Sequence, residues 1–384
     1  MNDLLWLLLP LAAASGWLAA RRSAKLKIKT EKLGSDYFQG LNFLLNEQAD
    51  KAIDAFVNMM AVDEDTFETH LALGSIYRRR GEVDRAIRIH QNLIARISLS
   101  AEQRSAAILE LGRDYMRAGL LDRAEVLFQE LVENDFHVLA ALQYLLDIYQ
   151  QEKDWNRAID VARGVDLAAG PDMRKVIAQL YCEQAEQALQ QGQLEKAHYL
   201  LDKALLKDKS CVRASLLEAK IAVREGDHKM AIVAWQRIES QDIDFIPEVL
   251  PGLRSSYQAM GDEMAVYPFL ERVMQNYQGV SPVILMAELI EKKEGIDAAI
   301  DFITQRLQQR ASVRGLEHLL KLGQQRQQDS GQLLILQQLV EKILLDKPTF
   351  RCNQCGFSGK TLHWQCPGCR EWNTVKPIYG VEGE

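Results

Sequence analysis

The sequence predicts an all-α protein in which stacked helical pairs form a superhelical solenoid, with one transmembrane helix before it and a small metal-binding domain after it. Three observations predict this architecture. A pattern of small and aromatic residues recurs about every 34 residues, the first 20 residues include a long uncharged stretch, and four of the six cysteines lie between residues 352 and 369. The 384 residues are 26% charged and 47% hydrophobic, which is typical of a folded chain with several structural units.

Residues 1–20 are predicted to be a transmembrane anchor. From Leu4 to Ala20 there are 17 residues without a charge, and a helix rising about 1.5 Å per residue nearly spans a hydrocarbon core of ~30 Å. Asp3 precedes this stretch and basic residues follow it, so the positive-inside rule places the N-terminus outside and the rest of the chain in the cytoplasm. Residues 21–34 then form a basic juxtamembrane linker. A cleaved signal peptide ending near AAASG and a buried soluble helix are the alternatives.

The body of the chain, residues 35–345, is predicted to hold about eight to nine units of two antiparallel helices. Turn positions 47, 81, 119, 153, 192, 226, 261 and 295 are 34, 38, 34, 39, 34, 35 and 34 residues apart. A small residue stands seven positions before several of these turns, and an aromatic residue follows it after three positions. The small residues are Gly40, Gly74, Gly112, Ala185 and Ala219, and the aromatic residues are Phe43, Tyr77 and Tyr115. This pattern resembles the tetratricopeptide repeat, whose units bury their apolar faces only by stacking on neighbours.

The residues between the repeat positions are assigned mainly to packing. Extra residues near 98–102 and 168–172 are predicted to lengthen the loops between units. The aromatic and cysteine residues expected in the core are Tyr115, Phe128, Trp155, Trp235, Cys182 and Cys211.

Four arginines on first helices of the repeat are candidates for binding a partner. Arg78 and Arg79 belong to one unit, and Arg113 and Arg117 belong to the next. Guanidinium groups on the inner wall of a solenoid suit carboxylates of a bound peptide. The alternative is that they solvate a helix face and pair with acidic neighbours such as Asp114.

The C-terminal segment, residues 349–384, is predicted to be a metal-binding domain. Its ligands would be Cys352, Cys355, Cys366 and Cys369, because two CxxC turns each direct two thiolates to one tetrahedral ion. Zinc is the expected metal and iron is the alternative, since the CNQCGF and CPGC turns resemble those of rubredoxin. His363 is expected to pack beside Trp364 instead of binding the metal. Trp364, Trp372 and Tyr379 give this domain a surface that packs either on the solenoid or on a partner.

Charge and motifs narrow the possible functions. The net charge is −7, and the tail has nearly balanced charges, so no nucleic-acid partner is expected. The chain carries no phosphate-binding glycine run, HExxH or nucleophile elbow, which gives enzymatic activity no support from motifs.

The whole chain resembles the lipopolysaccharide assembly protein B family of Gram-negative bacteria. The resemblance is carried by the anchor, by GEVDRAIRIHQ and LGRDYMRAGLLDRAE, and by CNQCGF and CPGCREW. It implies a non-enzymatic adaptor in the inner membrane, with a periplasmic N-terminus, that helps the FtsH protease degrade the deacetylase of the lipid A pathway. It also implies contacts with a lipopolysaccharide-sensing membrane regulator and with other assembly proteins, and it makes the four cysteines the metal ligands. Two alternatives are a rubredoxin-like electron carrier and a structural scaffold unconnected with proteolysis.

Overall fold

The computed structural model describes residues 67–96, 99–326, 331–345, 347–381 and 383. Its described residues fall into two compact units, divided between Ile148 and Tyr149. The predicted anchor and the basic linker lie outside the described residues, as does the first predicted repeat. Within the described part of the chain, no helix is long and apolar enough to cross a bilayer.

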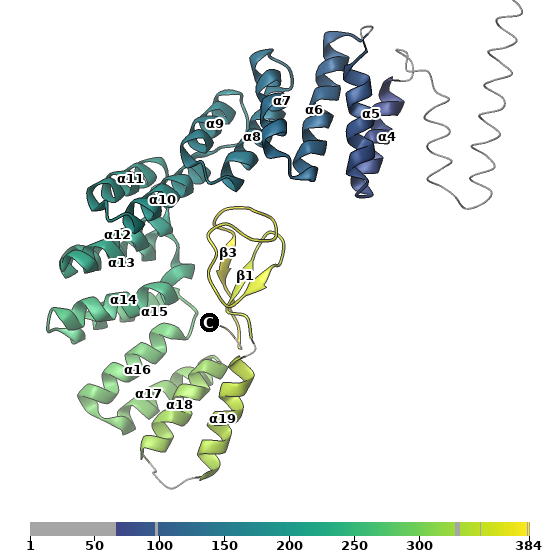
Figure 1. Cartoon of the computed structure of the whole chain (residues 1–384). Helices are drawn as coiled ribbons and strands as arrows, with labels where there is room; N and C mark the ends of the chain where they lie inside the picture. The colour runs from purple at the N-terminus through teal and green to yellow at the C-terminus, as the bar shows by residue number, and fades with distance from the viewer. Residues whose placement is uncertain (1–66, 97–98, 327–330, 346, 382, 384) are drawn as a thin grey trace, which may run out of the picture. The chain divides into compact units, whose positions relative to one another are not determined.

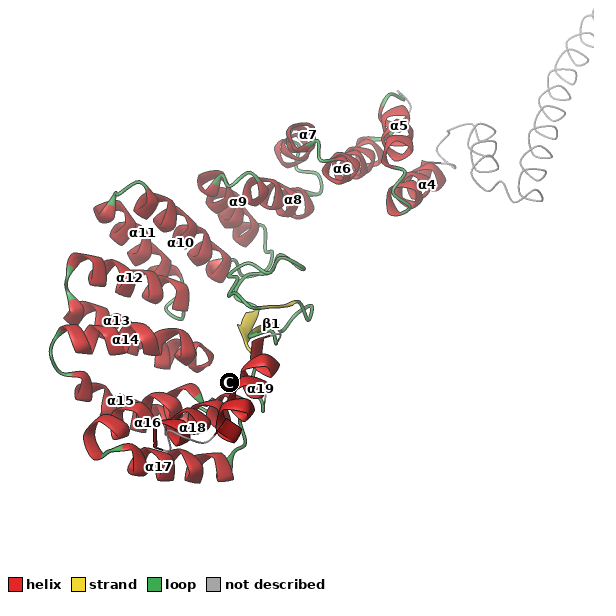
Figure 2. Cartoon of the chain, turned by 60° about the horizontal axis from the view of Figure 1, so that its bottom comes forward, coloured by secondary structure: helices red, strands yellow, loops and turns green. Residues whose placement is uncertain are grey.

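Helical pairs make up nearly all of the described chain before the C-terminal segment (Figures 1 and 2). The first unit contains α4 (Phe67–Arg79), α5 (Val83–Ile94), α6 (Ala101–Ala118), α7 (Leu121–Glu133) and most of α8 (Val138–Gln151). The second unit continues with α9 (Trp155–Leu167), α10 (Arg174–Gln190), α11 (Leu194–Lys207), α12 (Val212–Glu225), α13 (His228–Gln241), η1 (Ile243–Phe245), α14 (Ile246–Ala259), η2 (Glu263–Val266), α15 (Tyr267–Asn276), α16 (Ser281–Glu294), α17 (Ile296–Gln309), α18 (Val313–Arg326) and α19 (Gly331–Leu345). The described residues thus hold eight helical pairs, which confirms the predicted tetratricopeptide array.

The predicted turns from residue 81 to residue 295 all fall between the two helices of a pair. Gly119 shows why glycine suits them: it ends α6 with φ +74°, and its N–H donates to the carbonyl of Met116 at 3.2 Å. The lengthened loop near 168–172 is confirmed, because α9 ends at Leu167 and α10 begins at Arg174. The prediction near 98–102 is partly wrong. A capping box between Ser100 and Gln103 begins α6 at residue 101, so the last two residues of that stretch extend the helix.

The small residues predicted before the turns do bring the paired helices close together. A Cβ added at Gly74 would lie 2.4 Å from the ring of His90, and one added at Gly112 would lie 2.5 Å from the ring of Phe128. The residues predicted to be core are all buried: Tyr115, Phe128, Trp155, Trp235, Cys182 and Cys211. In these two pairs a ring of the second helix thus packs against a glycine of the first.

A network of ion pairs joins α14, η2 and α16 in the second unit. Glu263 accepts hydrogen bonds from Lys292 at 2.6 Å and from Arg254 and Gln258 at 2.7 Å. The hydrogen bond from Lys292 has the largest effect on the pKa of Glu263; together with that from Arg254 it outweighs burial and lowers this pKa from 4.5 to about 2. This carboxylate therefore holds three elements together in its ionised form.

The C-terminal segment folds as a small ribbon of three antiparallel strands (Figure 1, yellow). Strand β1 (Phe350–Cys352) lies between β2 (Ser358–Gly359) and β3 (Val375–Pro377). Phe350 pairs with Gly359 on one side and with Pro377 on the other. The buried residues are Phe350, Cys352, Cys366 and Val375, so the core of the ribbon consists of metal-site cysteines and two apolar side chains.

Candidate metal centre and its docking on the helical array

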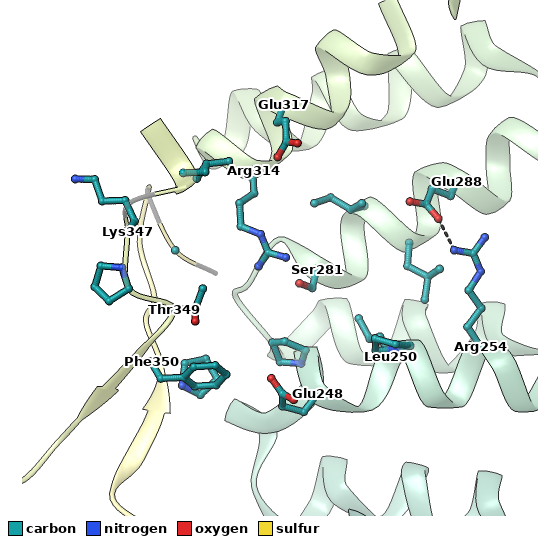
Figure 3. Close-up of a pocket in the computed structure, with 18 residues that line it drawn as sticks. Glu248, Leu250, Arg254, Ser281, Glu288, Arg314, Glu317, Lys347, Thr349 and Phe350 are labelled. Carbon is teal, nitrogen blue, oxygen red and sulfur yellow. Dashed lines mark hydrogen bonds and ion pairs between the residues drawn. The ribbon is translucent and has the colours of Figure 1, made fainter. Parts of the chain in front are cut away.

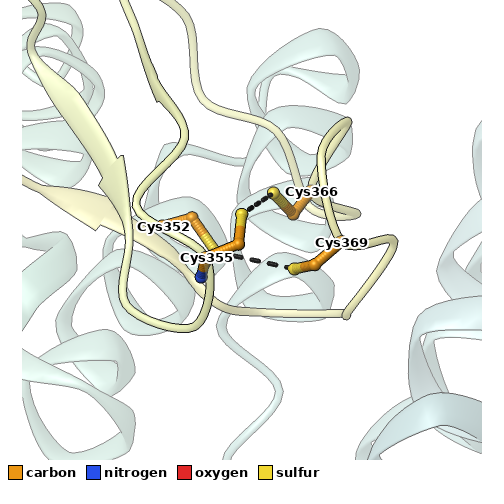
Figure 4. Close-up of side chains that lie close together, drawn as sticks. All are labelled: Cys352, Cys355, Cys366 and Cys369. Atoms are coloured by element: carbon orange, nitrogen blue, oxygen red, sulfur yellow. Dashed lines mark hydrogen bonds between the residues drawn. The ribbon is translucent and has the colours of Figure 1, made fainter.

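The four predicted ligands converge at one end of the ribbon (Figure 4). Cys352 ends β1, Cys355 lies in the turn that follows, and Cys366 and Cys369 belong to the second turn. All four sulfurs lie within 4.8 Å of one another, with 3.8 Å between Cys352 and Cys369 and 3.6 Å between Cys355 and Cys366. Sulfurs at the corners of a tetrahedron, each about 2.3 Å from zinc, are about 3.8 Å apart. The ribbon therefore provides a four-cysteine metal site.

Local hydrogen bonds favour the thiolate form that a metal requires. The amides of Gln354 and Cys355 donate to Cys352 Sγ at 3.4 and 3.5 Å, and Thr374 Oγ1 lies 3.3 Å from it. Burial acts to raise the pKa of Cys352, but the hydrogen bond with Thr374 and the two amides lower it to about 6. The opposite holds for Cys369, where the amide of Glu371 lowers the pKa while burial and the neighbouring sulfurs raise it to about 12. Four thiolates this close together are stable only around a cation.

His363 is not placed to be a fifth ligand. Its ring lies edge-on to Phe357 at 5.9 Å, and its Nε2 is 3.1 Å from Thr361 Oγ1. The prediction that His363 is not a ligand fits this geometry. Its ring contacts Phe357, and its packing beside Trp364 stays a prediction. Four sulfur ligands complete a tetrahedron and leave no position for a substrate. The metal, when bound, would supply cross-linking of the two turns.

The metal-binding ribbon packs on the helical array of its own chain. Of the two predicted packing surfaces, the solenoid or a partner, the structure shows the solenoid. Its first contact is with the end of α8, where Gln150 Oε1 accepts hydrogen bonds from Trp372 Nε1 at 2.8 Å and from Gln365 Nε2 at 3.2 Å. Trp364 joins the hydrophobic core of the second unit and stacks on Phe245 with 5.4 Å between ring centroids. Both tryptophans predicted to form a packing surface are thus used inside the molecule.

Arg213 is the charged centre of this contact. It belongs to α12, is only 3% exposed, and forms ion pairs with Glu183 at 2.8 Å and Glu186 at 3.1 Å. Its guanidinium carbon lies 5.9 Å from the ring centroid of Trp364 and 6.0 Å from that of Trp372. Burial acts to lower the pKa of Arg213, but the two carboxylates outweigh it and raise the pKa. The ribbon therefore covers a cation that the array already neutralises.

A second group of contacts holds the strand β3 and the residues after it. Lys376 forms an ion pair with Asp242, and its Nζ lies 4.2 Å from the ring centroid of Phe245. Tyr379 donates to Asp244 Oδ1 at 2.7 Å, and burial, followed by this carboxylate, raises the pKa of the tyrosine. Farther along, the carbonyl of Val381 accepts a hydrogen bond from the amide of Val313 at 2.7 Å. The ribbon thus contacts the array from α8 to the start of α18.

A cavity of about 570 Å³ lies where the ribbon meets α14, α16 and α18 (Figure 3). Its walls combine apolar and charged side chains, and Phe350 of the ribbon forms one side. Arg254 and Glu288 form an ion pair at one end. Burial raises the pKa of Glu248, with Lys220 acting in the opposite direction, and burial lowers the pKa of Arg314. Because the walls come from both domains, the shape of the cavity depends on the docking of the ribbon.

The four candidate arginines fall into two classes. Arg78 forms ion pairs with Glu110 and Asp114, and Arg113 pairs with Glu110 at 2.6 Å. Arg79 and Arg117 are exposed, and within the described residues neither has a hydrogen-bond or ion-pair partner. Their role in binding a partner remains a prediction, and the exposed pair is the better placed for it.

Comparisons with known proteins agree with this architecture. Residues 350–377 match the family described as rubredoxin metal binding domain, and residues 69–105 and 182–240 match tetratricopeptide repeat families. Lipopolysaccharide assembly protein B of Escherichia coli (strain K12) is 43% identical over 100% of both chains, and that of Haemophilus influenzae is 35% identical over 100% of both chains. Among solved structures, a tetratricopeptide repeat protein from Parabacteroides merdae is similar over 67% of this chain and 98% of its own, with 15% identity and a TM-score of 0.33. At 43 and 35% identity over its full length, the chain belongs to the lipopolysaccharide assembly protein B family.

Proposed function

We propose that this protein is an inner-membrane adaptor that limits lipopolysaccharide synthesis by bringing the FtsH protease and the deacetylase of the lipid A pathway together. The observation that carries the proposal is the identity of 43% over the full length of lipopolysaccharide assembly protein B of Escherichia coli. The closed four-sulfur site and the repeat array support it, because they suit a scaffold that binds proteins rather than an enzyme.

Tethering supplies the mechanism. The predicted anchor, residues 1–20, confines the chain to the inner membrane with its N-terminus in the periplasm and its array in the cytoplasm. Two partners held on one tethered array meet at a high effective concentration, so the affinity for each can be modest. A lipopolysaccharide-sensing membrane regulator and other assembly proteins are the further proposed partners. The exposed guanidinium groups of Arg79 and Arg117 are the proposed contacts for acidic side chains.

The proposal is tested by the half-life of the deacetylase after depletion of this protein. We expect the half-life to increase several-fold and to return to normal when the wild-type chain is restored. A half-life unchanged by depletion would contradict the proteolytic role and leave the alternative of a structural scaffold.

The arginine contacts are tested in the same assay by charge reversal. The variant Arg79→Glu with Arg117→Glu should fail to restore turnover and should co-purify less of one partner. Arg88→Glu with Arg96→Glu changes the charge equally at exposed positions of α5 and the loop after it, and should restore turnover fully. Equal behaviour of the two variants would show that the predicted arginine contact is wrong, without bearing on the adaptor role.

A further inference from the structure

Helix α19 ends the array with an apolar face open to solvent. Six aliphatic side chains on this helix are between 49 and 69% exposed: Leu334, Ile335, Leu336, Leu339, Ile343 and Leu345. The helix packs inward through Val340, which is 9% exposed. The last unit of a solenoid normally has a polar outer face, because no further unit covers it. Here the chain continues directly into β1, so the described residues contain no further helix to cover α19.

The exposed residues form a stripe that is complementary to itself. Ile335, Leu336, Leu339 and Ile343 lie on one side of the helix, since residues four apart are neighbours on its surface. Ile335 precedes Leu339 by four residues and Ile343 follows it by four. In an antiparallel arrangement about a two-fold axis at Leu339, this leucine meets its own copy and Ile335 meets Ile343 of the partner. Leu339 and both isoleucines of the stripe then have an apolar partner.

The charges of α19 are compatible with this pairing. Lys342 lies at the edge of the stripe, and the two-fold arrangement places it beside Leu336 of the second copy. Its alkyl stem can cover that leucine while its ammonium group stays in water. The other charged side chain, Glu341, lies away from the stripe and accepts a hydrogen bond from Gln337 at 2.7 Å. No two like charges face each other.

A lipid surface is a poorer match for this face. Helices that lie in a membrane interface carry several lysines or arginines along their polar side. Lys342 is the one basic residue in α19. We propose that the exposed stripe of α19 binds the same stripe of a second copy of this chain, so that the protein is a homodimer joined at the ends of its arrays. This inference does not depend on the proposed adaptor function.

Disulfide formation in membranes tests the contact at residue resolution. We expect full-length Leu339→Cys to form a disulfide-linked dimer on mild oxidation, at least tenfold more than Leu206→Cys, whose position on α11 is 80% exposed. Of the native cysteines, Cys182 and Cys211 are buried and the other four are ligands of the metal site, so the single-cysteine variants are compared with the wild-type chain under the same oxidation. Mixing a chain carrying Ile335→Cys with one carrying Ile343→Cys should give more dimer than either chain alone, because the register brings those two positions together.

A measurement without new thiols tests the same surface. Two differently tagged full-length copies should co-purify from membranes, and Leu339→Glu in both copies should reduce this at least tenfold while Leu206→Glu does not. The proposal is overturned by equal crosslinking of Leu339→Cys and Leu206→Cys, or by co-purification that Leu339→Glu leaves unchanged. A crosslink from residue 339 to a protein of different mass would also overturn it, because another partner would then cover the stripe.

Discussion

Replacing Arg213 with alanine should loosen the ribbon from the array without releasing the metal. The guanidinium carbon lies 5.9 and 6.0 Å from the ring centroids of Trp364 and Trp372. These distances are near the outer limit for a cation over an indole ring, so each contact contributes about 0.5–1 kcal/mol. The two rings together stabilise docking by about 1–2 kcal/mol, which corresponds to roughly a 5- to 30-fold change in the docking equilibrium.

The ion pairs of Arg213 act on a different equilibrium. Glu183 and Glu186 belong to α10, so their pairs with Arg213 lie within the array and not across the ribbon contact. Breaking a fully buried pair costs about 3–5 kcal/mol. These carboxylates are 25 and 36% exposed and water rehydrates them, so we expect only about 1 kcal/mol from their loss. This part should lower the stability of the array and leave the docking equilibrium nearly unchanged.

Hydrogen exchange of the full-length protein measures the two effects separately. In Arg213→Ala, the amides of residues 362–377 should lose 5- to 30-fold in protection while the metal content stays the same, because opening of the ribbon exposes them. Arg272→Ala is the matched control, since Arg272 is exposed and its contacts with Glu239 and the ring of Phe269 both lie within the array. Equal protection of the ribbon in both variants would refute the reasoning.

The remaining predictions concern the metal site, the helix packing and the pH dependence. Replacing Cys352 and Cys355 with serine should reduce bound metal to none in elemental analysis and unfold the ribbon; a red wild-type protein with a reversible one-electron couple would instead support the electron carrier. Gly112→Ala forces a Cβ against an aromatic ring and should lower the free energy of unfolding by about 1–3 kcal/mol. In the control Gly323→Ala the added Cβ has its nearest neighbour at 3.7 Å, so this variant should raise the free energy of unfolding by about 0.5–1 kcal/mol. Urea titrations that show equal shifts for the two variants would contradict the close packing at Gly112. Because the pKa of Glu263 is lowered from 4.5 to about 2 in the folded protein, its contribution is complete above pH 4.5 and is lost as the pH falls toward 2. The unfolding free energy of wild type should fall more steeply over this range than that of Glu263→Gln, and parallel curves would show that the carboxylate does not act as described.

The repeat and the metal ligands could be predicted from the sequence because each depends on residues close together in the chain. A turn such as that at Gly119 needs a positive φ, and a helix contact such as that at Gly112 needs a missing side chain, so both leave a fixed residue type at a fixed spacing. The two CxxC turns show their chemistry in the same way. The start of α6 was predicted less well, because the capping box of Ser100 and Gln103 is a local signal that the repeat spacing alone does not contain.

The sequence predicts the ribbon's half of the docking contact but not the half that the array contributes. Trp364 and Trp372 stand out in a short polar tail and indicate a packing surface. Their partners do not stand out: Arg213 has the sequence of an ordinary helical arginine, and Gln150 lies at the end of a helix 222 residues before Trp372. Contacts between segments so far apart depend on the curvature of the array, which no local pattern specifies. A buried charge among apolar helical residues, as in CVRASLL around Arg213, was the one available signal.

The ribbon makes the metal relevant to the helical repeats of the second compact unit. Each unit of a solenoid contacts mainly its neighbours, so the curvature of the array is a sum of many small and separately adjustable angles. The ribbon and the residues after it, in contrast, contact Gln150 at the end of α8, Asp242 before η1 and Val313 at the start of α18. A segment of fewer than forty residues has too small a core to fold without a cross-link, and two of the four buried residues in its core are metal-site cysteines. Loss of the metal should therefore release the ribbon from several helical repeats at once. The second compact unit, Tyr149–Glu384, should then become more flexible over its whole length instead of only at its end.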